Sequence, residues 1–142
     1  MSHQQQLAFF DIALEEVRNK NILINSVLEI GSYDVNGSIR KLIASKEYLG
    51  VDLVDGPGVD LTYDGLNLEL DRDFDISVSS ECFEHDPNWM NTFKNMIKYT
   101  KDGGAIIFTC ASKGRLEHGT TRTNPNHSPG TIHLKSEYYK NL

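Results

Sequence analysis

The sequence predicts an α/β protein: a three-layer, doubly wound, mostly parallel sheet of about five strands. Short apolar segments that end in a polar or acidic residue alternate with stretches of helical periodicity and glycine-containing turns. The first apolar segment, 26–30, is followed by a glycine, a polar loop and a second glycine, which is typical of a strand–turn–helix unit. In folds of this class, ligands bind at the carboxyl ends of the strands, beside helix N-termini.

Length and composition place the chain among globular proteins. Its 142 residues suffice for one domain with a buried core, in which we expect a lead helix over 1–25, a core over 26–111 and a loop with the start of a truncated part over 112–142. The net charge of −6 arises from acidic residues in the first two segments, which disfavours binding to duplex nucleic acid. No apolar run reaches membrane-spanning length and no signal peptide is recognisable, so we expect a cytoplasmic protein that does not bind membranes.

Apolar periodicity predicts a helix over residues 3–20 and a short one over 37–44. A third helix is expected after Asp86 and Pro87, which suit the N-cap and first-turn positions, and the segment 101–104 should end it and turn the chain. The expected apolar face of the first helix comprises Leu7, Phe10, Ile12, Leu14 and Val17, and that of the third comprises Trp89, Met90, Phe93, Met96 and Ile97.

Short segments that contain apolar residues predict the strands, and the Val-Leu-x-Ile sequence of the first one suggests burial on both faces, as in a parallel sheet. Their expected bounds are 26–30, 47–52, 59–62, 74–80 and 105–110. Residues 113–130 lack hydrophobic periodicity and should form a long loop, of the kind that often serves as a lid or binding segment. Residues 136–142 look like the beginning of a helix.

Candidate ligand-binding residues lie where the first two predicted strands end. Gly31 allows the backbone to approach a ligand, and the pair Asn36 and Gly37 tolerates positive φ and permits a sharp entry into the helix. Glu29 could accept hydrogen bonds from loop amides or face a cationic ligand. Asp52 could accept hydrogen bonds from ribose hydroxyls, the alternative being a helix cap or a solvated loop residue.

These elements resemble the class I S-adenosylmethionine-dependent methyltransferases, which have a Rossmann-like fold. Residues 27–31 look like the first motif of that family, and 74–85, with Glu-His before a helix, is similar to its fourth-strand motif. The resemblance implies S-adenosylmethionine as cofactor, with Asp52 on the ribose and Asp64 on the adenine. The implied cofactor residues are Glu29, Gly31, Ser32, Tyr33, Asn36, Gly37, Asp52, Leu53, Asp64, Gly65, Ser80 and Glu81.

The sequence departs from the family pattern in two respects. Tyr33 and Val35 stand where the family commonly has glycines, so the methionine part of the cofactor could lie differently. Tyr33 also disagrees with the dinucleotide-binding pattern, which disfavours an NAD-dependent oxidoreductase. The family's sheet normally has seven strands, whereas five are predicted here: either the sequence is a fragment, or a partner such as a second copy covers the exposed edge.

Methyl transfer requires alignment of the acceptor with the sulfonium and sometimes a base, for which His85 and His118 are the candidates. The alternatives are a polar residue at a helix N-terminus for His85 and a solvated loop residue for His118. The expected acceptor is a small molecule, and the basic residues after 110 would suit an anionic or sugar-bearing one. The alternative function is a non-catalytic module that binds S-adenosylmethionine or a nucleotide and lacks a complete acceptor site.

No metal site is expected, because the spacings between His118, His127 and His133 match no zinc signature and no cysteine is near them. Cys82 and Cys110 lie in apolar segments and are expected to be reduced thiols in the core.

Overall fold

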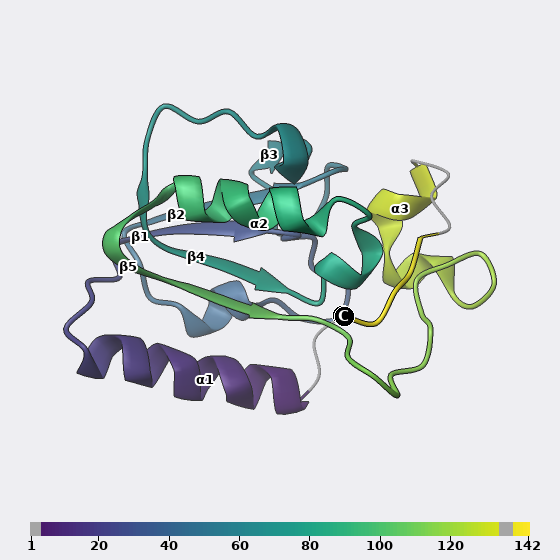
Figure 1. Ribbon diagram of the computed structural model, residues 1–142, viewed down its shortest axis with the longest axis horizontal. Coiled ribbons are helices and arrows are strands. Elements are labelled where there is room, and N and C mark those ends of the chain that lie inside the picture. The colour runs from purple at the N-terminus through teal and green to yellow at the C-terminus, as the bar shows by residue number, and fades with distance from the viewer. Residues whose placement is uncertain (1–3, 134–137) are drawn as a thin grey trace.

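The computed structural model describes residues 4–133 and 138–142, and a five-stranded sheet lies at its centre (Figure 1). All neighbouring strands pair in parallel, in the order β3-β2-β1-β4-β5, so the predicted doubly wound parallel sheet is confirmed. The strands are β1 (Ser26–Ile30), β2 (Glu47–Asp52), β3 (Leu61–Thr62), β4 (Phe74–Ser80) and β5 (Thr100–Thr109). The predicted bounds of β1, β2 and β4 are confirmed, whereas β3 begins two residues later than expected and β5 five residues earlier.

Helices cover both faces of the sheet, which gives the predicted three layers (Figure 1). On one face, α1 (Gln4–Asn19) contributes Phe10, Leu14 and Val17 to a core that includes residues of β1 and β4. On the other face, α2 (Trp89–Lys98) contributes Met96 to a second core, with Phe74 and Phe83. The sheet therefore packs against a hydrophobic core on each of its two faces.

The apolar faces predicted for the two long helices are too broad. Ile12 of α1 is 64% exposed, and Met90 and Ile97 of α2 are 61% and 52% exposed. Each helix packs against the flat surface of a sheet, so only a narrow stripe of its side chains is buried. In α1 that stripe consists of Gln6, Phe10, Leu14 and Val17.

The helix predicted over 37–44 is wrong: the structure has a single 3₁₀ turn there, η1 (Ile39–Leu42). The Ser38 side chain accepts the N–H of Arg40 and begins the turn. The amides of Lys46 and Glu47 both donate to the carbonyl of Asn25, so the chain must return to β2 within a few residues. A segment this short gains too few hydrogen bonds to sustain an α-helix.

Both ends predicted for the third helix are also wrong. Asp86 accepts hydrogen bonds from the Asn88 amide and the Thr92 hydroxyl, so Asp86 forms a turn and α2 begins only at Trp89. The helix ends at Lys98, before the segment 101–104. That segment lies inside β5, at an irregularity where pairing moves from Phe74–Thr100 to Ile76–Ala105.

The segment after β5 has more regular structure than a single loop. Besides irregular chain, it contains the 3₁₀ turn η4 (Pro125–His127) and the short helix α3 (Pro129–His133). The helix predicted to begin at 136 falls partly outside the described residues, and 138–142 is not helical. Residues 138–142 return to the main body, where Lys140 donates to the Glu84 carbonyl and Leu142 to the Ala111 carbonyl.

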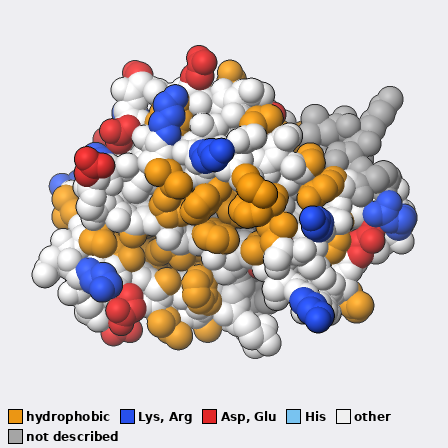
Figure 2. Space-filling view, in the orientation of Figure 1, with side chains coloured by type: hydrophobic (Ala, Val, Ile, Leu, Met, Phe, Trp, Pro, Cys, Tyr) orange, Lys and Arg blue, Asp and Glu red, His pale blue; other side chains and the backbone are white. Residues whose placement is uncertain are grey.

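Exposed apolar side chains gather over α2 and β5 (Figure 2). They include Met90 and Ile97 of α2 and Phe108 of β5, which is 38% exposed. Within the described chain, β5 is the last strand at this side of the sheet. No described helix has the length and apolar character needed to cross a membrane.

Candidate functional site

A cavity of about 280 Å³ opens at the carboxyl ends of β1, β2 and β4, near the lower size limit of small-molecule sites. This is the end of a parallel sheet at which ligands of doubly wound folds bind. Of the cofactor residues expected from the sequence, all except Asn36 line the cavity; those that do are Glu29, Gly31, Ser32, Tyr33, Gly37, Asp52, Leu53, Asp64, Gly65, Ser80 and Glu81.

The turn after β1 forms the floor of the cavity and is fixed by backbone contacts. Gly31 has a φ of +78°, and a Cβ atom there would lie 2.6 Å from the Cβ of Cys82. Only glycine fits this position, because the left-handed backbone and the Cys82 contact both exclude a side chain. The Asp34 carboxylate accepts the Gly37 amide at 2.6 Å and closes the loop.

Asp52 lies at the end of β2 with its carboxylate directed at the turn after β1. One oxygen accepts the Tyr33 amide at 3.0 Å and the other accepts the Leu53 amide at 2.7 Å. Burial raises the pKa of Asp52 above its usual value, although these amides oppose the shift. A carboxylate can accept about four hydrogen bonds, so Asp52 retains acceptor capacity toward a ligand in the cavity.

Glu29 is 3% exposed and has a side-chain partner that the sequence did not suggest. The Tyr48 hydroxyl donates to its carboxylate at 2.7 Å, so this hydrogen bond comes from a side chain of β2 and not from a loop amide. Burial raises the pKa of Glu29 to about 7, against the lowering effects of the Tyr48 hydrogen bond and the Arg40 charge. Glu29 therefore sits at the cavity wall as a carboxyl group that titrates near neutral pH.

Asp64 and Gly65 line the cavity on the side of β3. The Asp64 carboxylate accepts the Leu66 amide at 2.9 Å and thereby begins the 3₁₀ turn η2 (Gly65–Asn67). This contact is local and exposed, so it leaves Asp64 able to accept a further hydrogen bond from a ligand.

The end of β4 brings a strained residue to the cavity. Glu81 has a φ of +51°, which is unusual for a residue with a side chain, and its amide donates to the Thr109 carbonyl at 2.9 Å. Strained backbone of this kind tends to occur at functional sites. Cys82 follows it on the cavity wall and is a free thiol, as is Cys110.

Sequence reasoning missed the part of the wall that comes from the segment after β5. Residues 127–131 line the cavity, and Gly130 packs against Asp52 and Leu53. The length of the irregular segment indicated that it could cover a site, but no local pattern singled out these residues.

The two candidate bases lie side by side although they are far apart in the sequence. The ring centroids of His85 and His118 are 5.0 Å apart, and the Tyr139 ring packs against both. His85 lines the cavity, and His118 lies behind it. Both are buried, so the interpretation of His118 as a solvated loop residue is wrong. Burial lowers the pKa of His85 to about 3, which makes it a weaker base than a free imidazole.

Comparisons with known proteins show which fold this is. No protein-family model matches the chain, and no curated protein matches it in sequence. Among solved structures, it is similar to an S-adenosylmethionine-dependent methyltransferase from Clostridium acetobutylicum (19% identity, TM-score 0.61), with 78% of this chain and 52% of that chain covered. It is also similar to the sugar N-methyltransferase KedS8 from Streptoalloteichus (15% identity, TM-score 0.58, 80% and 51% covered).

A third solved structure, the N-methyltransferase NodS from Bradyrhizobium japonicum, is 18% identical with a TM-score of 0.57, over 79% of this chain and 72% of that one. The chain thus spans about half the length of the first two structures and more of the third. At these identities the likeness establishes the fold, which is the one that the sequence resemblance implied.

Proposed function

We propose that this chain, which has the fold of class I S-adenosylmethionine-dependent methyltransferases, binds S-adenosylmethionine in the cavity and transfers its methyl group to a small-molecule acceptor. The observation that carries the proposal is the composition of the cavity wall. The Gly31 turn, Asp52 at the end of β2 and Glu81 after β4 converge on one space at the carboxyl ends of the strands.

The cavity wall suggests how the cofactor would lie. Asp52 has acceptor capacity for the ribose hydroxyls, and Asp64 lies further along the same wall, toward β3, where the adenine would follow. Glu29 and Glu81 give the other side of the cavity an acidic character, which suits a positively charged sulfonium. The Tyr33 ring packs against Gly56 and narrows the space beside the turn after β1.

The acceptor would enter beside the segment after β5, which supplies residues 127–131 to the wall. Two of the similar structures are named as N-methyltransferases, one of them of sugars, which supports a small-molecule acceptor. An anionic or sugar-bearing acceptor is supported further by the basic residues of this segment. We place the enzyme in the cytoplasm, for which the two free cysteines are the support.

A second copy of the chain is our proposed cover for the edge of β5. Edge strands with exposed apolar side chains favour association, and Phe108 lies on this strand next to the exposed residues of α2. Light scattering of the purified chain should then give the mass of a dimer, and Phe108→Lys should give a monomer. A wild-type monomer at high concentration would contradict this part of the proposal.

Calorimetric titration of the chain with S-adenosylmethionine, S-adenosylhomocysteine and NAD tests the cofactor. We expect binding of the first two and none of NAD. Binding of both without methyl transfer in a screen of hydroxyl, amine and carboxyl acceptors would favour the alternative function, a module that binds the cofactor without catalysis. Absence of any binding would overturn the proposal.

Asp52→Ala should weaken S-adenosylmethionine binding by about 2–3 kcal/mol, or roughly 30- to 150-fold in Kd, because charge-assisted hydrogen bonds to the ribose are lost. The same titration measures this effect. His118→Ala is the matched variant: it should leave cofactor affinity nearly unchanged, since His118 lies behind the cavity wall. Equal affinities of Asp52→Ala and wild type would remove Asp52 from the cofactor site.

A further inference from the structure

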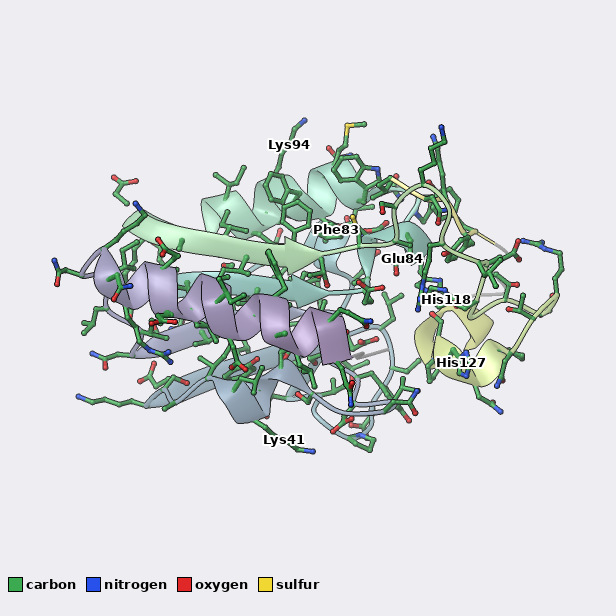
Figure 3. All side chains as sticks on the ribbon, turned by 90° about the horizontal axis from the view of Figure 1, so that it is seen from below. Lys41, Phe83, Glu84, Lys94, His118 and His127 are labelled. Carbon is green, nitrogen blue, oxygen red and sulfur yellow. The ribbon has the colours of Figure 1, made fainter. Side chains whose placement is uncertain are left out.

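Three buried side chains of metal-ligand type meet beside the cavity. Glu84 and His85 belong to the 3₁₀ turn η3 (Phe83–His85) after β4, and His118 comes from the segment after β5. Their exposed fractions are 0%, 9% and 7%, and one ligand atom of each lies within 4.8 Å of the others. Figure 3 shows Glu84 and His118 close to each other on segments that are far apart in the sequence.

The Glu84 carboxylate is buried without a hydrogen bond. Neither oxygen has a hydrogen-bond partner among the described residues. The amides of Glu84 and Ala111 lie near enough to favour the charged form, but they do not reach hydrogen-bond geometry with the oxygens. A fully buried acceptor that stays unpaired is costly and rare in folded proteins, so these oxygens require a partner.

The His118 ring presents an unprotonated nitrogen to this carboxylate. Its Nδ1 lies 3.2 Å from the Leu116 carbonyl oxygen, which can only accept, so Nδ1 carries the ring proton. Nε2 of the neutral ring then carries a lone pair and acts as an acceptor. This nitrogen lies 3.7 Å from Oε1 of Glu84 and has no hydrogen-bond partner in the described chain. Two acceptors that face each other in a buried site are satisfied by a metal ion between them or by a shared proton.

His85 completes the arrangement from the cavity side. Its Nδ1 is also buried and lacks a hydrogen-bond partner in the part of the chain that the structure describes. Gly119 makes room for this ring: it has a φ of +68°, and a Cβ atom there would lie 2.8 Å from Cε1 of His85. Three separate side chains thus bring potential metal-binding atoms to within 4.8 Å of one another in a buried place.

We propose that Glu84, His85 and His118 bind a divalent transition-metal ion, most suitably Zn²⁺. Two imidazoles and one carboxylate form a ligand set typical of catalytic zinc sites and related first-row metals, and Mg²⁺ and Ca²⁺ prefer sites built of oxygen atoms alone. The contact from Nδ1 of His118 to a carbonyl is the orienting hydrogen bond that metal-binding histidines commonly make.

The surrounding residues pack against the three side chains and shield them from solvent. The Tyr139 ring packs on both histidines at centroid distances of 5.4 and 5.0 Å, and its hydroxyl donates to the same Leu116 carbonyl that orients His118. The Lys140 amide donates to the Glu84 carbonyl. The segment 138–142 therefore packs over the cluster, and of its three side chains His85 is the one that lines the cavity.

The position of the ion refines the expected acceptor, and this step rests on the proposed function. Three protein ligands leave at least one coordination position open. Because His85 lines the cavity, an acceptor hydroxyl could occupy that position, where the ion would lower its pKa and fix its orientation. The structure thereby favours an oxygen-bearing acceptor, such as a sugar hydroxyl.

The site is tested with the full chain, without cofactor, after removal of metals by a chelator. We expect the protein to bind one Zn²⁺ per chain in calorimetry, and to give the visible absorption of nitrogen- and oxygen-bound Co²⁺. Glu84→Gln and His118→Gln should each weaken Zn²⁺ binding more than tenfold. His127→Ala is the matched control: His127 also lines the cavity but lies outside the cluster, and its removal should leave Zn²⁺ affinity unchanged.

Three results would overturn the proposal: no binding of either ion by wild type, equal binding by Glu84→Gln and wild type, or a loss in His127→Ala as large as in Glu84→Gln. In the first case, a proton shared by Glu84 and His118 fills the space instead. Thermal unfolding of each variant without metal checks that it folds. Separate titration with S-adenosylmethionine distinguishes a failed metal site from a failed cofactor site.

Discussion

The structure buries a glutamate at the end of β1 and another just after β4, and the two differ in what surrounds them. Glu29 is 3% exposed and Glu84 is 0% exposed, and burial raises the pKa of each to about 7. Glu29 accepts a hydrogen bond from Tyr48 and lies near Arg40, whereas Glu84 faces two imidazoles and has no hydrogen-bond partner among the described residues.

The difference teaches what each carboxylate does. Glu29 is satisfied within the fold by a side chain of the neighbouring strand, so it can serve the structure and the cavity at once. Glu84 is satisfied by nothing that the structure describes, so its burial is costly unless a cation joins it. Similar burial and similar pKa shifts thus accompany different roles, and the hydrogen-bond partners distinguish them.

The largest effect expected from this comparison is the pH dependence caused by Glu29. Its pKa is raised from 4.5 to about 7, so its contribution to stability is fully present below pH 4.5 and is lost as the pH rises through about 7. The contribution amounts to up to about 3 kcal/mol. Denaturant unfolding at several pH values, for wild type and Glu29→Gln, should show a difference that follows this window. A pH-independent difference between the two proteins would contradict the raised pKa.

The stabilisation of the folded chain by Zn²⁺ should also differ between variants of the two glutamates. An ion at a hundred times its Kd stabilises the folded state by about 2.7 kcal/mol. We expect this gain for wild type and Glu29→Gln and its loss in Glu84→Gln, as measured by thermal unfolding with and without Zn²⁺. A gain that survives in Glu84→Gln would place the ion elsewhere.

The smallest effect should come from the partner of Glu29. Tyr48→Phe removes the donor at 2.7 Å and should destabilise the chain by about 1–2 kcal/mol above pH 7, where Glu29 is charged. Because Tyr48 lies away from the cluster, Zn²⁺ affinity should not change. Denaturant unfolding and calorimetry measure the two quantities, and a loss of Zn²⁺ affinity would show that the two regions are coupled.

The sequence predicted the sheet well because each strand carries its own signal. Residues 74–80 are buried along almost their whole length, and the apolar residues Phe74, Ile76 and Val78 alternate along the segment, which is typical of a strand. The helix predicted over 37–44 was wrong, because the apolar residues of this segment fit a helix but the return of the chain to β2 leaves room for only one 3₁₀ turn there. Local patterns do not contain this tertiary constraint.

The candidate site was predictable only where it is built from strand ends. Asp52 ends a predicted strand and Gly31 and Asp64 follow two others, and parallel strands bring such residues to one edge. The meeting of His118 with Glu84 depends on the path of an irregular segment, which no periodicity encodes. The sequence singled out His118 as a candidate base but not Glu84, and it gave no indication that Nε2 of His118 and Oε1 of Glu84 lie 3.7 Å apart.

The irregularity in β5 determines which face of the sheet each later residue of the strand packs on. Beyond it, Ala105 and Ile107 pack toward α1, while Ile106 and Phe108 pack toward α2. Deleting a single residue between 101 and 104 would exchange these two sets and turn the strand inside out. For protein engineers, a change of chain length within this four-residue stretch would therefore alter the packing of both faces of β5, although residues 101–103 are themselves exposed.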